Sequence, residues 1–252
     1  MKRWWLIPVI LVSFFHSVRG QEKSIAFKHL TSEDGLSDNQ VTCMLRDRQG
    51  FLWIGTKDGL NRYDGRDFYM FRHRAGDSTS LCSNNITCLA YDNDSILWIG
   101  TSVSGFCSYD FRTQKFKTYH KDNTPLGSNS INVIRFDSVR NCLWLGLNNG
   151  GLQLFHLKTK SMATPDTKSS LDIEMLGAVR STYDIVFKNS TPFIASLTES
   201  LKKLANLSFK KRTPGSPLEP ALTINAALAA SDGNIWCGAW DNALHQFNDD
   251  AK

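Results

Sequence analysis

The sequence predicts an all-β fold: a β-propeller of four-stranded antiparallel blades, incomplete, with about five blades in this chain. A tryptophan inside a short apolar run, with a glycine two residues later, recurs at positions 53, 98, 144 and 236. The first three copies lie about 45 residues apart and the last interval is about twice as long. That spacing is typical of a stacked repeat in which one copy has been weakened.

The first repeat shows how one period divides into strands. Residues 41–45, 51–56 and 60–64 form short apolar or alternating runs that suit β-strands, and a fourth run follows them. Asp47 and Gly50 bound the first turn, because an aspartate side chain bonds nearby backbone N–H groups and glycine tolerates left-handed backbone. The second and third repeats follow the same plan, which predicts one blade for each.

The later repeats are less regular. The fourth lacks the tryptophan and the Asp-x-x-Gly turn, and Phe193 is the expected replacement for the ring. The fifth keeps Trp236 and ends after its third strand. We therefore expect blades over residues 36–80, 81–126, 127–172, 173–214 and, in part, 222–248.

Residues 25–30 are similar in pattern to the fourth strands of the repeats, and we expect them to form an outer closing strand. A propeller avoids an open edge when one terminus completes the blade begun at the other. Strand counting permits closure onto the fifth blade. A longer propeller, of which this chain is an N-terminal portion, is the favoured hypothesis.

The N-terminus has the features of a secretory signal. Lys2 and Arg3 precede an apolar run over residues 4–15, and small residues follow it. We expect a signal peptide over residues 1–20 and a propeller region over residues 21–252, placed in the periplasm. An uncleaved anchor is the alternative, because Arg19 is unusual beside a cleavage site.

Charge and cysteine content exclude several kinds of site. The formal charge of +5 falls to about +2 without the basic residues of the leader, and no basic stripe remains for nucleic acid. The six cysteines mostly occupy core positions of the repeat, and only Cys82 and Cys107 are placed to make a bridge plausible. No Cys-x-x-Cys pair indicates zinc, so we expect no metal and no cofactor.

The residues that recur are interpreted as structural. Large rings at one position of each blade fill the space between blades, and an aromatic platform for a ligand is the less favoured alternative. No catalytic residue is assigned, and the ligand-binding residues are unknown. The structural repeat residues are Trp53, Trp98, Trp144, Trp236, Asp47, Gly50, Asp92, Asp137 and Gly233.

Two further patterns bear on function. Polar loops at 37–39, 83–85 and 128–130 either line a polar mouth or, as we favour, cap the backbone where the strands begin. A glycosidase needs two carboxylates across a cleft, but the candidates are scattered along the chain. These candidates are Glu33, Asp34, Asp58, Glu174 and Glu199.

Residues 27–41 and 47–65 resemble the two-component regulator propeller, the periplasmic sensor of hybrid histidine kinases. The resemblance implies a ligand-sensing role, with carbohydrate-derived ligands such as an oligosaccharide, and homodimerisation of the full-length sensor. It also implies a connector domain, a membrane helix and a kinase core, none of which we find here, so this region is expected to be non-enzymatic. A secreted scaffold for protein interactions and, less favoured, a polysaccharide-processing enzyme are the alternatives.

Overall fold

The computed structural model describes residues 27–93, 96–163, 181–188, 191–196, 201–203, 224–232, 234–239 and 244–247. The chain divides into two units, Met1–Leu30 and Thr31–Lys252. The signal peptide expected over residues 1–20 lies outside the described residues. Within the described ranges, no helix has the length and apolar character that a membrane span requires.

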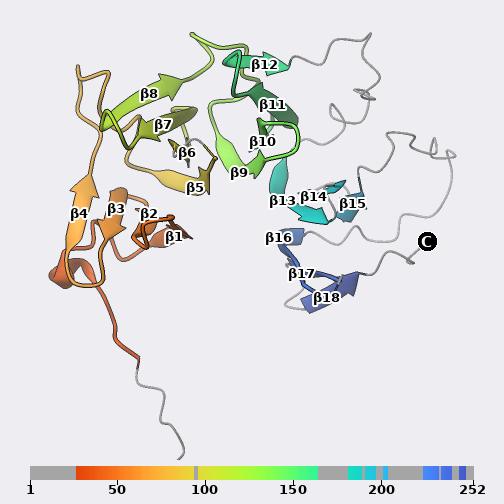
Figure 1. The fold of residues 1–252 in the computed structure, drawn as a ribbon, viewed down its shortest axis with the longest axis horizontal. Coiled ribbons are helices and arrows are strands. Elements are labelled where there is room, and N and C mark those ends of the chain that lie inside the picture. Colours follow the sequence, from red (N-terminus) through yellow and green to blue (C-terminus); the bar gives the residue numbers. More distant parts are fainter. Residues whose placement is uncertain are drawn as a thin grey trace, which may run out of the picture. The chain divides into compact units, whose positions relative to one another are not determined.

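The second unit begins with a short 3-10 helix, η1 (Ser32–Asp34), and continues as five antiparallel sheets whose strands follow chain order (Figure 1). Three sheets have four described strands and two have three. Blade 1 contains β1 (Val41–Arg46), β2 (Leu52–Thr56), β3 (Gly59–Tyr63) and β4 (Phe68–Phe71). Blade 2 contains β5 (Ile86–Tyr91), β6 (Ile96–Thr101), β7 (Phe106–Asp110) and β8 (Lys115–Tyr119).

The remaining sheets continue this order. Blade 3 contains β9 (Ile131–Asp137), β10 (Cys142–Leu147), β11 (Leu152–His156) and β12 (Ser161–Ala163). Blade 4 contains β13 (Thr182–Lys188), β14 (Thr191–Ser196) and β15 (Leu201–Lys203). Blade 5 contains β16 (Ile224–Ala229), β17 (Ile235–Ala239) and β18 (Leu244–Phe247).

Turn chemistry explains why the strands begin and end where they do. Asp47 Oδ1 accepts the backbone N–H groups of Gln49 and Phe51 at 2.9 and 3.0 Å, which shapes the turn between β1 and β2. Gly50 leaves this turn with φ +96°, in the left-handed region that favours glycine. The Asp-x-x-Gly sequence of the first blade therefore favours a tight β-hairpin.

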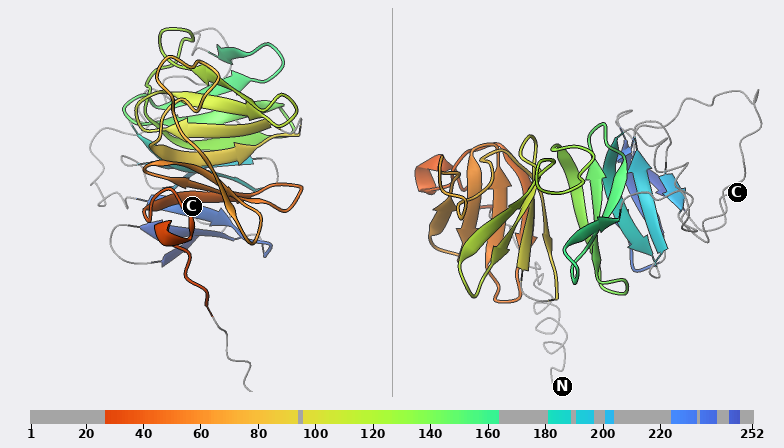
Figure 2. Two further views of the ribbon diagram at one scale, coloured as in Figure 1. Left: turned by 90° about the vertical axis from the view of Figure 1, so that its left-hand side faces the viewer. Right: turned by 90° about the horizontal axis from the view of Figure 1, so that it is seen from above.

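Adjacent blades pack through their innermost strands, with β1 against β5, β5 against β9, β9 against β13 and β13 against β16 (Figure 1), and Figure 2 shows the blades side by side. The approach is close. A Cβ atom placed on Gly100 would lie 3.0 Å from Ile131 Cγ2 of the next blade. In blades 1 to 3, glycine at this position of the second strand therefore lets the next blade approach closely.

Every innermost strand also carries a β-bulge near its first residue, which the sequence pattern did not reveal. Two bulge side chains bond the next blade: Thr87 Oγ1 donates to the carbonyl of Ile131 at 2.6 Å, and Asn132 Nδ2 donates to that of Thr182 at 3.1 Å. The bulges aim these side chains across the blade boundary. The bulged residues are Thr42, Thr87, Asn132, Tyr183 and Asn225.

The predicted fold class is confirmed: the described part of the chain is all-β, with propeller blades that do not close into a complete ring. The fourth strand expected in blade 4, near residues 208–211, lies outside the described residues. Residues 27–30, the described part of the closing strand expected over residues 25–30, form no strand. That these residues complete a blade stays a prediction.

Candidate ligand-binding site

The repeated tryptophans lie between blades. Trp53 and Trp98 are fully buried and Trp144 is nearly so. The ring of Phe155 in blade 3 lies 5.6 Å from that of Trp98, and the ring of Phe187 in blade 4 lies 6.3 Å from that of Trp144. These indoles fill the boundary with the following blade, so their faces are not available to stack on a ligand.

Each of these indoles is also hydrogen-bonded by the turn aspartate of its own blade, a pairing that we call the tryptophan clasp. In blade 2, Trp98 Nε1 donates to Asp92 Oδ2 at 2.7 Å, while Asp92 Oδ1 accepts the N–H of Ile96 at 3.0 Å. One carboxylate thus shapes the turn and satisfies a buried indole. The equivalent bonds join Trp53 to Asp47 at 2.8 Å and Trp144 to Asp137 at 3.1 Å.

Blade 5 keeps only part of this arrangement. Trp236 is half-buried, and Gly233 of the expected turn lies outside the described residues. Leu228, directly across the sheet from Trp236, is 66% exposed, and Leu244 is 68% exposed. The equivalent face of each preceding blade is covered by the next blade, whereas these two leucines of blade 5 meet solvent.

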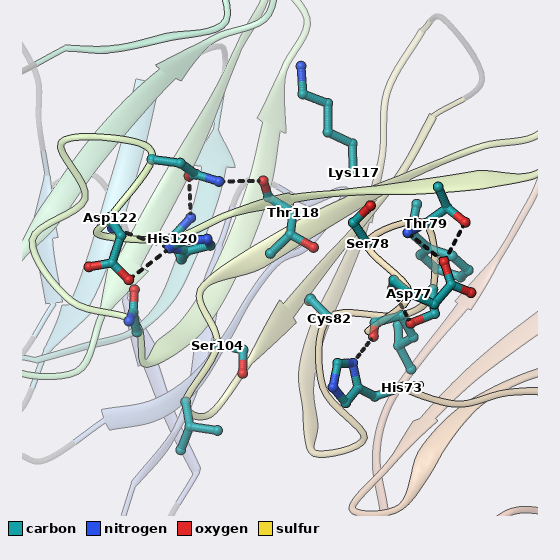
Figure 3. A pocket seen from close by; sticks show the side chains of 16 residues that line it. His73, Asp77, Ser78, Thr79, Cys82, Ser104, Lys117, Thr118, His120 and Asp122 are labelled. Carbon is teal, nitrogen blue, oxygen red and sulfur yellow. Dashed lines mark hydrogen bonds and ion pairs between the residues drawn. The ribbon is translucent and has the colours of Figure 1, made fainter. Parts of the chain in front are cut away.

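A polar cavity of about 850 Å³ lies beside blade 2 and is the candidate ligand-binding site (Figure 3). Residues from the β4–β5 connection (73–82) and the β8–β9 connection (120–129) form two of its walls. Residues 103–104 of the β6–β7 turn and 116–118 of β8 complete the lining. Polar side chains outnumber apolar ones in every one of these segments except the turn.

The wall formed by the β4–β5 connection is fixed by Thr79. Asp77 Oδ1 accepts the hydroxyl and the backbone N–H of Thr79 at 2.7 and 2.9 Å. The carbonyl of Thr79 accepts the N–H of Phe116 at 3.1 Å, which ties the connection to β8. The hydrogen bonds from Thr79 lower the pKa of Asp77, so its carboxylate is charged at neutral pH.

The opposite wall is organised around His120. Its N–H donates to Asn123 Oδ1 at 2.8 Å, and its Nδ1 lies 3.3 Å from Asp122 Oδ2. Asn129 Oδ1 accepts the N–H of Lys121 at 2.9 Å, which holds the connection against the entry to blade 3. The connection is therefore shaped by its own side chains before any ligand arrives.

Several polar groups in the cavity have no hydrogen-bond partner in the described part of the chain. Among the described residues, no hydrogen bond engages the hydroxyls of Ser78, Ser104 or Thr118, which Figure 3 places around the cavity. The ammonium group of exposed Lys117 lies 5.5 Å from the centre of the Tyr119 ring. Three hydroxyls, one cation and the charged Asp77 together suit a polar ligand with many hydrogen-bonding groups.

The polar loops noted in the sequence have a capping role in the structure. The amide oxygens of Asn39, Asn84 and Asn129 each accept a backbone N–H from the segment that leads into their blade. The donors are Ser32, His73 and Lys121, at 2.8, 2.8 and 2.9 Å. Asn129 also lines the cavity, so one of these loops contributes to the candidate site as well.

The described members of the scattered carboxylates do not line the cavity. Asp34 accepts the N–H of Thr31 at 2.8 Å in the cap of η1, and Asp58 forms an ion pair with Arg72 at 2.7 Å. Glu174 and Glu199 lie outside the described residues. Within the described part of the chain, no cluster of three histidine, cysteine or acidic residues could hold a metal ion.

Comparison with known sequences identifies the repeats. The family model of the two component regulator propeller matches residues 35–58 and 80–103, the tryptophan-bearing parts of blades 1 and 2. Histidine kinase P4 of Formosa agariphila is 42% identical over 82 residues, which are 32% of this chain and 6% of that protein. The chain thus spans a small part of the length of this relative.

Comparison with solved structures identifies the fold. The extracellular domain of the hybrid two component system BT3049 from B. thetaiotaomicron superposes with a TM-score of 0.73 at 23% identity, covering 88% of this chain and 30% of that chain. PorZ of Porphyromonas gingivalis, a component of the type-IX secretion system, gives 0.57 at 16% identity over 84% and 32% of the two chains. The resemblance seen in the sequence is confirmed: this chain carries repeats of the two-component regulator propeller in the fold of such extracellular domains.

Proposed function

We propose that this chain is the ligand-sensing propeller of a two-component signalling protein and that the cavity beside blade 2 binds the ligand. The observation that supports this most is the set of unpartnered hydroxyls on Ser78, Ser104 and Thr118 within one cavity. Ser104 and Thr118 are half-buried and Ser78 is exposed, so all three hydroxyls are free to exchange water for a ligand. The match to a histidine kinase supports the signalling role.

The ligand class that we propose is a carbohydrate-derived molecule such as an oligosaccharide. A sugar offers several hydroxyls that both donate and accept, which matches a lining of hydroxyl, amide and carboxylate groups. Lys117 adds a positive charge that would favour a sugar carrying an acidic group. The cavity volume of about 850 Å³ is within the range of small-molecule sites.

Binding would act through the blades rather than through chemistry. The two cavity walls lead into blades 2 and 3, so a ligand that bridges them would bias how these blades pack, and a rigid-body shift could pass to further domains. We propose a periplasmic location, from the signal peptide expected over residues 1–20. We also propose that this region has no enzymatic activity, which the scattered carboxylates support.

The test is a binding screen of the full chain against a panel of neutral and acidic oligosaccharides, followed by titration calorimetry. Ser104→Ala with Thr118→Ala removes two unpartnered hydroxyls, and we expect a loss of at least tenfold in affinity for the best ligand. Ser138→Ala is the matched control, because this exposed serine lies in the β9–β10 turn, outside the cavity. No glycan binding, or binding that the double variant leaves unchanged, would overturn the assignment of this cavity.

A further inference from the structure

Two of the six cysteines lie next to each other beside the cavity. All six are free thiols in the structure. Cys82 and Cys107 belong to the same buried cluster, which also contains Trp53, at the boundary between blades 1 and 2. Cys82 ends the β4–β5 segment that lines the cavity, and Cys107 lies on β7.

The two side chains are neighbours: both belong to the same buried cluster, and Cys82 acts on the electrostatics of the Cys107 thiol. Cys107 is fully buried, while Cys82 retains a small exposed surface in the cavity wall. Neighbouring thiols in one cluster can form a sulfur–sulfur bond when their Cα atoms lie within about 7 Å of each other.

We propose that Cys82 and Cys107 form a disulfide when the chain meets a small disulfide such as glutathione disulfide. The Cys82 thiolate, reached from the cavity, attacks one glutathione sulfur and releases a glutathione thiolate. The Cys107 thiolate then attacks the Cys82 sulfur of this mixed disulfide and releases the second glutathione. The two protons lost by the cysteines end on the two glutathione thiols, so one disulfide is reduced as the other forms.

Burial sets the rate of this exchange. Burial raises the pKa of the Cys107 thiol well above its ordinary value, and the adjacent Cys82 raises it further. Since the thiolate is the attacking species, the second step should be slow at neutral pH and faster as the pH rises. The reaction is thus expected to have a rising pH profile up to the point at which the protein unfolds.

The disulfide would fix one wall of the cavity. It would close a loop of about 25 residues and join the β4–β5 connection to β7. The oxidised chain should melt about 5–10 °C higher than the reduced chain, and reduction should reverse the shift. The inference does not depend on the identity of the ligand or on the proposed signalling role.

The experiment is to incubate the full chain with glutathione disulfide at pH 8, quench with acid, alkylate free thiols under denaturing conditions and map peptides by mass spectrometry. We expect four alkylated cysteines and one cross-linked pair of peptides containing Cys82 and Cys107. Cys142 and Cys237 are internal controls, because each is buried in a different cluster and should stay alkylated. The map uses the wild-type chain, so it does not depend on whether a variant folds.

Two outcomes would overturn the inference. One is six alkylated cysteines after prolonged oxidation, and the other is a stable glutathione adduct on Cys82 without a cross-link. Cys107→Ser supplies a second check, since it should trap the adduct on Cys82 and abolish the rise in melting temperature. A rise in melting temperature that survives this substitution would also contradict the proposed pair.

Discussion

Blades 2 and 4 occupy equivalent places in the repeat and are held by different chemistry. Blade 2 has the tryptophan clasp, in which Asp92 shapes a turn and bonds the buried Trp98. Blade 4 has Phe193 at the position of the indole, with no N–H to satisfy and no turn aspartate to satisfy it. The fold of a blade therefore requires a buried aromatic ring at this position. A hydrogen bond between that ring and the turn of the same blade adds stability.

Blade 4 instead depends on its neighbours through Asp184. Arg135 of blade 3 forms an ion pair with Asp184 at 2.6 Å and also donates to the carbonyl of Ile185 at 2.9 Å. Asp184 Oδ2 accepts the N–H of Ala227 from blade 5 at 2.9 Å. One carboxylate therefore links three blades and adds an ionic contact to the apolar packing of blade 4 against blades 3 and 5.

Removing the aromatic ring should give the largest effect and should separate the two blades most clearly. Trp98→Ala is expected to lower the free energy of unfolding by about 3–5 kcal/mol, because it leaves a cavity and removes the hydrogen bond from the indole to Asp92 Oδ2. Phe193→Ala should cost roughly 1 kcal/mol less, since its ring is smaller and carries no hydrogen bond. Urea denaturation of both variants measures the difference, and equal losses would argue against a special role for the clasp.

Breaking the ion pair should weaken blade 4 specifically. Asp184→Asn is expected to cost about 2 kcal/mol, because the carboxylate is nearly buried and bonds both neighbouring blades, while partial exposure of Arg135 moderates the loss. Asp122→Asn is the matched control, since this carboxylate is exposed and should change stability by less than about 0.5 kcal/mol. Thermal unfolding measures the loss of stability in both variants. Equal losses for Asp184→Asn and Asp122→Asn would contradict the role given to the ion pair.

Because the blades approach closely, we expect blade 2 to tolerate a methyl group at the position of Gly100 less well than blade 4 does at the matching position. Gly100→Ala should destabilise blade 2 by about 1–3 kcal/mol, because its Cβ would meet Cys88 Sγ and Ile131. Blade 4 already has Ala195 at the matching position, with Asp184 in place of the thiol. Adding Cys88→Ala to Gly100→Ala should recover part of the loss, and a double variant no better than the single one would count against steric overlap.

The smallest predicted effect is a gain. The hydroxyl of Thr182 is buried and has no hydrogen-bond partner within the described part of the protein. Thr182→Val keeps the shape and should raise the free energy of unfolding by about 1 kcal/mol. Thr101→Val is the opposite case, because its buried hydroxyl donates to the Gly105 carbonyl at 2.8 Å, and it should lose about 1–2 kcal/mol. Chemical denaturation of both variants tests this prediction. The free energy of unfolding should rise for Thr182→Val and fall for Thr101→Val, and changes in the same direction would contradict it.

The sequence predicted the architecture well because the repeat is local. Asp47, Gly50 and Trp53 lie within one hairpin, so their spacing reports directly on a turn and a core position. The hydrogen bond between the aspartate and the indole escaped prediction, although both residues had been identified, because turn chemistry alone already explained the aspartate. The periodicity also did not predict the β-bulges, since one extra residue near the start of a strand leaves the pattern of apolar residues unchanged.

The candidate site could not be predicted in the same way. Its lining comes from connections whose sequences do not repeat, such as residues 73–82 and 120–129, and only folding brings them together. Asn129 carried a weak signal as part of a recurring polar loop. The ion pair between Arg135 and Asp184 could not be predicted from the sequence either. These residues replace apolar ones in other blades and lie 49 positions apart.

The tryptophan clasp should make a blade more resistant to opening than an inter-blade ion pair does. Hydrogen–deuterium exchange, followed by mass spectrometry of the full chain, measures this directly for peptides from β5–β7 and β13–β14. We expect amide exchange at least about tenfold slower in the blade 2 peptides than in the blade 4 peptides. Equal protection in the two blades, or slower exchange in blade 4, would contradict it.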